Sequence, residues 1–296
     1  MTARAPYLII GNGQIGSALA DKLGGDAAQV TRDALDLATA TDADYRALLE
    51  KHQPSIVINA AAYTAVDKAE SERELAMQIN GNAPGLLANA CAEQNTLLIH
   101  YSTDYVFDGT GKTPWTESDA PSPINYYGET KLAGERAIEA SGAAHLIFRV
   151  SWLYAKEGCN FVNTMLKLGT ERESLSIVVD QIGAPCYAED IADATIEIAK
   201  QYLGKPDGLA SGVYHMCNGG ETSWYDFALE IWDHANRYES MLVRNVKAIP
   251  TAEYPTPAAR PRNSRMNCNK LRHTFDVSLP HWKGSLLRFM EKKYAN

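Results

Sequence analysis

The chain alternates short apolar runs with longer segments of helical spacing. The apolar runs are Tyr7–Ile10, Ala28–Thr31, Ile56–Asn59, Leu97–Tyr101 and Leu146–Val150. Most of them are apolar throughout, which is typical of strands that are covered on both faces, as in a parallel sheet. The segments near 14–23, 42–52, 72–94 and 127–141 have the spacing of helices. This order predicts an α/β fold with a doubly wound parallel sheet, which binds ligands at the C-terminal ends of its strands.

The pattern changes after Val150, where proline and glycine become frequent and strands are less regular. Helices are expected near 160–169, 187–202, 223–238 and 282–293. We interpret this part mainly as a smaller α/β domain that holds the substrate. The expected division assigns 1–150, with part of 175–200, to a cofactor-binding domain, and 151–174 and 201–296 to the substrate domain.

Composition narrows the class of protein. The 296 residues carry a net charge of -8, which disfavours a nucleic-acid partner. The longest apolar runs are too short for a bilayer span, and residues 1–6 lack the features of a signal peptide. Five scattered cysteines without a Cys-x-x-Cys pair argue against a disulfide framework, and the seven histidines form no recognisable metal motif. We expect a cytoplasmic protein without a membrane partner or a metal.

A glycine-rich turn follows the first apolar run. It reads Gly11-Asn12-Gly13-Gln14-Ile15-Gly16 and leads directly into a helix-like segment. Glycine lets the backbone turn tightly and approach a pyrophosphate, and a helix N-terminus offers free N–H groups to the phosphates. The position between strand and helix makes this turn a predicted dinucleotide site in a Rossmann-like domain.

The end of the second apolar run bears on the choice of cofactor. Thr31-Arg32 stands where an NAD-specific enzyme would place an acidic residue for the ribose hydroxyl. An arginine there can pair with a 2′-phosphate, although a solvated surface arginine is the alternative. Asp36 and Leu37 are expected to border the adenine. The sequence therefore favours NADPH, with NADH as a tolerated second cofactor.

A tyrosine and a lysine stand one helical turn apart. Tyr127 and Lys131 begin a predicted helix and share one of its faces. A nearby ammonium lowers the pKa of a phenol and makes it a usable general acid. Ser102 and Thr103 end the fourth strand, where a hydroxyl can bind a substrate carbonyl, unless these hydroxyls merely cap the turn. The set predicts carbonyl reduction by a nicotinamide.

With these motifs the chain resembles the extended short-chain dehydrogenase/reductases and, within them, the dTDP-4-dehydrorhamnose reductases. The resemblance runs from residue 11 to about 270, and the stretch from Asn59 to Glu70 is more specific than the glycine turn. The other matching stretches are 102–109, 127–135, 149–154, 180–185 and 260–264.

The resemblance implies an activity and a role for each matching residue. It implies NADPH-dependent reduction of the C-4 ketone of dTDP-4-dehydro-L-rhamnose, the last step in making dTDP-L-rhamnose for a cell-wall or surface polysaccharide. Tyr127 would donate the proton, Lys131 would tune it and hold the nicotinamide ribose, and Thr103 with Asp104 would position the ketone. The implied cofactor contacts are Asn59, Ala60, Ala61, Tyr63 and Ser102, and the implied substrate contacts are Phe107, Trp152, Arg260, Asn263 and Ser264.

The sequence departs from this family at two places. Cys186 stands where a threonine is usual after Pro185, and we expect it to be a small buried wall residue. Some members form a magnesium-bridged dimer through carboxylates. Glu189 matches one such position, but Ala18 replaces another glutamate. We therefore expect no magnesium bridge, and a homodimer is a separate expectation.

Two other functions are compatible with the fold. A nucleotide-sugar epimerase or dehydratase would return the hydride to the same substrate, but dehydratases usually place an acidic pair after the threonine, and Asp104-Tyr105 supplies one carboxylate. A non-catalytic relative, similar to the regulatory subunit of methionine adenosyltransferase, would typically lose part of the catalytic set. This chain keeps Thr103, Tyr127 and Lys131.

Overall fold

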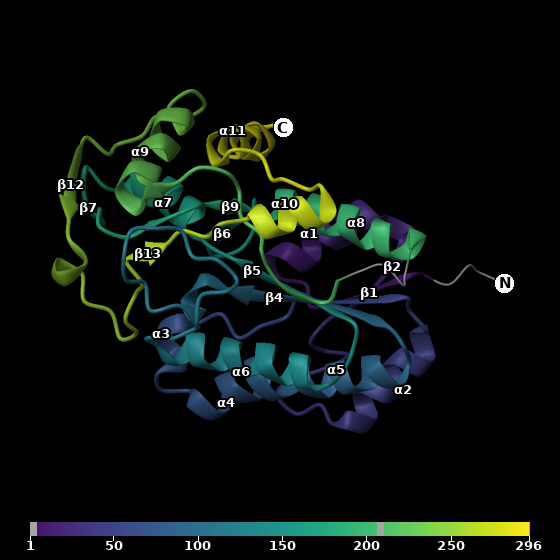
Figure 1. The fold of residues 1–296 in the computed structure, drawn as a ribbon. Helices are drawn as coiled ribbons and strands as arrows, with labels where there is room; N and C mark the ends of the chain where they lie inside the picture. Colours follow the sequence, from purple (N-terminus) through teal and green to yellow (C-terminus); the bar gives the residue numbers. More distant parts are fainter. Residues whose placement is uncertain (1–4, 206–209, 296) are drawn as a thin grey trace.

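The computed structural model describes residues 5–205 and 210–295, so most of segment 1–6, where we expected no leader, lies outside the described residues. Its centre is a parallel sheet of six strands within the described ranges, in the order β10-β5-β4-β3-β1-β2 (Figure 1). The bounds are β1 Tyr7–Ile10, β2 Ala27–Val30, β3 Ile56–Asn59, β4 Leu97–Thr103, β5 His145–Val150 and β10 Gly212–His215. The predicted doubly wound parallel sheet is confirmed.

Helices cover both faces of this sheet. One face carries α1 (Gln14–Leu23), α8 (Ala188–Gly204) and α10 (Asn269–Phe275), and the other carries α2 (Asp42–His52), α5 (Ala83–Glu93) and α6 (Tyr126–Ala140) (Figure 1). Side chains alternate along β1: Ile9 packs toward α1, whereas Leu8 and Ile10 pack toward α2 and α5. Both faces are apolar because both are buried, which explains the unbroken apolar runs.

The helix predicted over 72–94 is interrupted. α3 (Val66–Ala69) precedes α4 (Arg73–Met77), a wide turn at Gln78–Asn82 and then α5. Asn80 uses its side chain in that turn to bind the backbone of Tyr63 and the hydroxyl of Thr130. A Cβ at Gly134 of α6 would lie 2.2 Å from the Asn80 carbonyl oxygen. The close contact between α6 and this turn therefore holds the irregular backbone in place.

The sixth strand lies in a segment that we expected to belong to the substrate domain. β10 pairs with β5, from Gly212 with Leu146 to His215 with Arg149. α8 leads back to the sheet and packs on α1, and α10 contacts β10. The chain thus returns to the first domain later than the expected boundary at residue 201, because β10 reads Gly-Val-Tyr-His and lacks an unbroken apolar run.

The smaller unit packs helices around a separate apolar core. α7 (Phe161–Glu171), α9 (Trp224–Ala235) and α11 (Trp282–Tyr294) surround Phe227, Ile231 and Phe289. β7 (Ser174–Val178) pairs with β12 (Asn245–Ile249) at its outer edge. The remaining short strands are β6 Leu153–Tyr154, β8 Ile182–Gly183, β9 Cys186–Tyr187, β11 Thr222–Ser223 and β13 Asn263–Ser264, and short helical turns lie at Gly24–Asp26, Asp104–Val106 and Thr251–Glu253.

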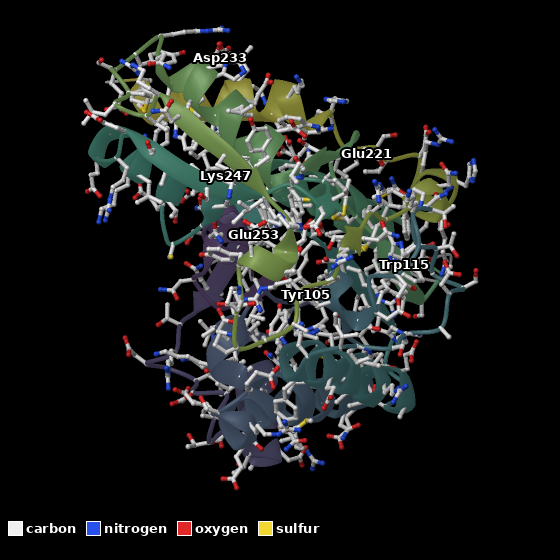
Figure 2. All side chains as sticks on the ribbon, turned by 90° about the vertical axis from the view of Figure 1, so that its left-hand side faces the viewer. Tyr105, Trp115, Glu221, Asp233, Lys247 and Glu253 are labelled. Carbon is white, nitrogen blue, oxygen red and sulfur yellow. The ribbon has the colours of Figure 1, made fainter. Side chains whose placement is uncertain are left out.

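Labelled side chains show where the two units lie. Figure 2 shows Asp233 of α9, Lys247 of β12 and Glu253 in the smaller unit, with Tyr105 below them, toward the main sheet. In the described part of the chain, no helix has both the length and the apolar character needed to cross a bilayer.

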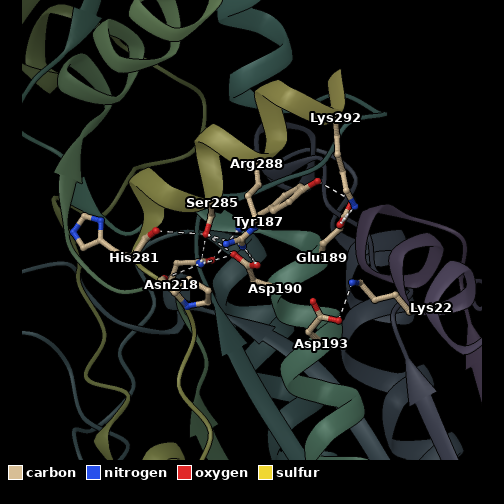
Figure 3. A network of polar contacts seen from close by, with 11 residues as sticks. Lys22, Tyr187, Glu189, Asp190, Asp193, Asn218, His281, Ser285, Arg288 and Lys292 are labelled. Atoms are coloured by element: carbon tan, nitrogen blue, oxygen red, sulfur yellow. Dashed lines mark hydrogen bonds and ion pairs between the residues drawn. The ribbon is translucent and has the colours of Figure 1, made fainter. Parts of the chain in front are cut away.

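The buried carboxylate of Asp190 connects the two units. Asp190, in the first turn of α8, accepts hydrogen bonds from Asn218 and from Ser285 of α11, and it pairs with Arg288 of α11 (Figure 3). A buried charge with several donors is stable only while all of them remain in place. This network therefore fixes α11 against the end of α8.

Candidate active site

A cleft of about 1040 Å³ opens at the C-terminal ends of β1, β3, β4 and β5. Its walls come from the glycine turn, the end of β2, the segment after β3 and the first turns of α6, with Trp224 and Lys292 from the smaller unit. The predicted site residues that line it are Gly11, Gly13, Gln14, Ile15, Arg32, Asp36, Leu37, Asn59, Ala60, Ala61, Ser102, Thr103, Asp104, Tyr127, Lys131 and Trp152.

The glycine turn forms a cradle at the N-terminus of α1. Gly11 has a φ of +100°, and a Cβ there would lie 2.9 Å from atoms of Ala61. A Cβ at Gly16 would lie 2.3 Å from the Gly11 carbonyl oxygen, so Gly16 supports the turn without lining the cleft. Gly13 is the N-cap and provides no side-chain cap to α1. The free N–H groups are thus left to face an anion in the cleft.

Arg32 lies at the opening of this cleft beyond β2. Its guanidinium donates to the carboxylate of Asp36 over 3.3 Å, and its side chain is 73% exposed. An exposed ion pair of this kind contributes little stability, so the arginine is free to change partner at small cost. Its position fits a phosphate group beside the adenosine end of a dinucleotide.

The reacting groups gather where β4 ends and α6 begins. Asn125 caps α6 by accepting a hydrogen bond from the N–H of Gly128 over 2.8 Å, which places Tyr127 in the first turn of the helix. The hydroxyl of Thr103 donates to the Asp104 carboxylate over 3.2 Å. The ring of Tyr105 meets that of Tyr127 edge to face, with centroids 5.7 Å apart. Two hydroxyls and a carboxyl therefore share one corner of the cleft.

Burial dominates the acidities in this corner. It raises the pKa of Asp104 to about 7, although hydrogen bonds from Ser264 and Thr103 act in the opposite direction. Burial, and then the charge of Asp104, raise the pKa of Tyr127 above its ordinary value. Near neutral pH the phenol therefore carries the proton that an acid catalyst must give up. In the protein without ligands burial governs the pKa of this phenol, and the role of Lys131 in lowering it stays a prediction.

Lys131 is buried behind the cleft. Its Nζ donates to the Tyr101 carbonyl oxygen over 2.7 Å and lies 3.1 Å from Nε2 of His100. Burial lowers the pKa of this lysine to about 8, while the charge of Glu135 acts to raise it. Both the amine and the ammonium are accessible near neutral pH, so the lysine can exchange a proton.

Unpaired polar atoms indicate that this cleft fits a polar ligand. The hydroxyl of Ser102 and Oδ2 of Asp104 are buried without a hydrogen-bond partner in the protein. Buried polar groups of this kind normally have a partner, and both of these line the cleft. With the glycine cradle, they fit a dinucleotide and an oxygen-rich second ligand.

Trp152 forms the far wall. It has a φ of +43°, which is rare for a side chain of this size, and its ring stacks on Trp224 with centroids 3.5 Å apart. A Cβ at Gly183 would lie 2.7 Å from the indole, so only glycine allows this packing. A strained backbone held by close packing is typical of binding sites. The two indoles offer a flat surface on which a sugar ring can lie.

Besides Gly16, five predicted residues lie away from the cleft walls. Phe107 is fully buried and stacks on Trp115, so its expected contact with substrate is wrong and it belongs to the core. The hydroxyl of Tyr63 donates a hydrogen bond to the carboxylate of Glu72. Arg260 pairs with Asp67 over 2.9 Å. The remaining two are Asn263, which donates to the carbonyl oxygens of Thr110 and Thr113, and Ser264, which acts to lower the pKa of Asp104.

Three residues of the site were missed. Tyr105 and Trp224 line the cleft, and His100 stands behind Lys131. Tyr105 lies within a matched motif, where an aromatic beside the catalytic threonine could have been noticed. Trp224 follows a helix cap and His100 lies in an apolar run, so their patterns indicated only a helix and a strand.

Cys186 is buried, as expected, but it packs in the main core and does not line the cleft, and its Sγ donates to the carbonyl oxygen of Ala184. Glu189 accepts a hydrogen bond from the Tyr187 hydroxyl and pairs with the ammonium of Lys292 (Figure 3). Because that ammonium already stands against the carboxylate, these residues do not fit a bridging magnesium ion. Across residues 5–205 and 210–295, no group of three or more potential ligands is arranged to hold a metal.

Comparisons with known proteins agree with this geometry. A family model described as the RmlD substrate binding domain matches residues 7–295. A dTDP-4-dehydrorhamnose reductase of Salmonella typhimurium is 47% identical over 83% of this chain and 82% of its own length. One of Escherichia coli is 48% identical over 82% and 81%. The crystal structure of a dTDP-4-dehydrorhamnose reductase from Bacillus anthracis in complex with NADP superposes with a TM-score of 0.88, at 36% identity, covering 98% of this chain and 100% of that one.

Proposed function

The chain belongs to the family of dTDP-4-dehydrorhamnose reductases, and from this premise we propose that it reduces the C-4 ketone of dTDP-4-dehydro-L-rhamnose with NADPH. The product is dTDP-L-rhamnose, so the reaction is the last step in making this nucleotide sugar. The observation that carries the proposal is the meeting of Thr103, Tyr127 and Lys131 in the cleft that also contains the glycine cradle. The NADP complex of the relative supports the choice of cofactor.

NADPH supplies a hydride when it is bound. The protein's part is to bind the ketone, polarise it and hand over a proton. Thr103 offers a hydroxyl to the ketone oxygen from the end of β4, beside the phenol of Tyr127. Because burial keeps that phenol protonated, Tyr127 is the proton donor.

Lys131 acts behind the phenol. When Tyr127 gives up its proton, the phenolate that remains is unfavourable in a buried site. A cation close by stabilises it, and the accessible ammonium of Lys131 serves this purpose. We also assign the same side chain to the nicotinamide ribose. Ionised Asp104 accepts the Thr103 hydrogen, but because its pKa lies at about 7 the carboxyl can also be protonated and donate to Thr103, which leaves the Thr103 hydrogen for the ketone oxygen.

The smaller unit holds the nucleotide sugar. Trp152 presents its stacked indole to the sugar ring. Arg260, Asn263 and Ser264 remain proposed contacts for the diphosphate, which would require Arg260 to exchange its bond with Asp67 for a phosphate. Tyr63 remains a proposed cofactor contact, which would likewise require its hydroxyl to release Glu72. We also propose a cytoplasmic location, consistent with five free cysteines, and the homodimer stays a prediction.

The test is a spectrophotometric assay in which upstream enzymes generate the keto sugar. We expect loss of NADPH absorbance in proportion to the keto sugar consumed. Tyr127→Phe should reduce turnover by about 100-fold or more, the range typical of a lost general acid, while NADPH binding stays nearly unchanged. Full turnover in this variant would contradict the mechanism. Reaction without net loss of NADPH would instead indicate an epimerase or a dehydratase.

A further inference from the structure

Three buried side chains form a continuous line behind the cleft. The amide nitrogen of Asn59 lies 3.1 Å from Nδ1 of His100, and Nε2 of the same imidazole lies 3.1 Å from Nζ of Lys131. Asn59 ends β3, His100 lies in β4 and Lys131 lies in α6. His100 is 1% exposed and Lys131 is 2% exposed, so water does not complete these contacts.

The direction of each hydrogen bond follows from a backbone contact. Oδ1 of Asn59 accepts the N–H of Ala61 over 3.2 Å, so the amide nitrogen must face His100. An amide nitrogen only donates, which requires a bare Nδ1 on the ring. A neutral imidazole then carries its hydrogen on Nε2, pointing at Lys131. That amine must accept this hydrogen with its lone pair while it donates to the Tyr101 carbonyl oxygen.

The ammonium form of the lysine needs the opposite arrangement. A protonated Nζ has no lone pair, so it must donate to a bare Nε2. The ring hydrogen then moves to Nδ1 and needs an acceptor, which the side chain of Asn59 supplies only by turning its oxygen toward His100. This turn breaks the contact with the N–H of Ala61, a residue that lines the cofactor side of the cleft.

We propose that His100 is a positioning residue whose tautomer changes together with the protonation of Lys131, with Asn59 biasing the pair toward the neutral amine. The inference rests on the proposed function and adds a residue to its proton-handling machinery. It links the charge behind Tyr127 to the backbone N–H of Ala61, a residue of the cleft wall.

The surrounding charges are compatible with this coupling. On α6, Glu135 acts to raise the pKa of Lys131, but it is itself bound by Arg149 of β5, with contacts of 2.9 and 2.6 Å. Burial, and then the charge of Lys131, hold the pKa of His100 well below its ordinary value. The imidazole therefore stays neutral near physiological pH, and only its tautomer is free to respond.

The test is NMR of the full chain labelled with ¹⁵N at its histidines, without cofactor or substrate. Signals of His100 are identified by their loss in His100→Gln. We expect the Nε2–H tautomer above about pH 9 and conversion to Nδ1–H as the pH falls through the pKa of Lys131, at about 8, without formation of an imidazolium. In Lys131→Met the Nε2–H tautomer should persist at every pH. A tautomer that does not respond to pH in the unaltered protein would overturn the proposal.

A second variant tests the role of Asn59. In Asn59→Asp the new carboxylate oxygen faces Nδ1 and requires a hydrogen there, so the ammonium is favoured and the midpoint should rise by about one pH unit or more. An unchanged or lower midpoint would contradict the coupling.

Steady-state kinetics test the role of His100 independently of the NMR titration. His100→Gln should lower kcat about tenfold with little change in KM, because His100 acts through Lys131 and does not touch the sugar. His215→Gln is the matched control, since His215 is also fully buried in the sheet but bonds to Trp115. An equal loss of kcat in both variants would assign His100 a merely structural role. The NMR titration needs no turnover, so it can fail or succeed whatever the substrate proves to be.

Discussion

The buried carboxyl of Asp104 makes folding stability depend on pH in an unusual direction. Its pKa is about 7 in the folded protein and 3.8 in an exposed chain. Between these values the folded state binds more protons than the unfolded state, so stability falls as the pH rises. Most aspartates that pair with a cation or accept several hydrogen bonds act in the opposite sense, because their pKa values are lowered on folding.

The size of the effect follows from the two pKa values. Within the window from about pH 4 to about pH 7, the folded state loses about 1.4 kcal/mol per pH unit relative to the unfolded chain. From about pH 5 to about pH 8 the loss sums to about 3 kcal/mol, since it levels off above pH 7. Asp104→Asn does not titrate and escapes this loss.

We therefore expect the difference in free energy of unfolding, Asp104→Asn minus the unaltered protein, to increase by about 3 kcal/mol between about pH 5 and about pH 8. Urea unfolding followed by tryptophan fluorescence, without ligands, measures it. Asp180→Asn is the control. Its hydrogen bonds to Thr251 and its pairing with Arg262 help to lower the pKa of Asp180, so its difference should stay flat over this range. A flat profile for Asp104→Asn would refute the assignment of a raised pKa.

Three further changes have defined outcomes. Glu135→Gln leaves the buried charge of Arg149 uncompensated and should lower the free energy of unfolding by about 3–5 kcal/mol, measured by urea unfolding, unlike an exposed ion pair. Arg32→Ala should raise KM for NADPH about tenfold or more while leaving KM for NADH nearly unchanged, since a charge-assisted bond to phosphate contributes about 2 kcal/mol; an equal change for both cofactors would exclude Arg32 as the phosphate partner. Gly183→Ala should displace the Trp152 indole and raise KM for the keto sugar more than KM for NADPH, and unaltered sugar kinetics would argue against this wall.

The sequence predicted β1, β3, β4 and β5 of the main sheet well because these strands are buried on both faces, whereas the edge strand β10 is half-exposed at its start and was missed. The runs Tyr7–Ile10 and Ile56–Asn59 and the helices at 14–23 and 42–52 have the predicted bounds. The expected continuous helix at 72–94 failed because two local signals were overlooked, namely Gly81 in the turn and Pro84 at the start of α5. The side chain of Asn80 also bonds to Tyr63 and Thr130, and neither contact changes the spacing of apolar residues from which a helix is predicted.

The candidate site was predictable where chemistry is carried by a residue type at a fixed spacing. Tyr127, Lys131 and Thr103 were found in this way, and all three line the cleft. What could not be predicted is which side chains turn inward. Phe107 lies within a matched motif yet packs into the core, and His100 lies in a buried strand yet contacts Lys131. Both outcomes depend on tertiary packing, which outweighs motif position.

The hydrogen bonds and the ion pair around Asp190 bear on the order in which this protein folds during synthesis. Lys292, carried by α11, lines the same cleft as Gln14 in the cofactor cradle. A growing polypeptide can build the cradle early, but its cleft lacks a wall until translation has passed residue 292. Nascent molecules halted before α11 would have a cleft with one side missing and an Asp190 that lacks its partners Ser285 and Arg288.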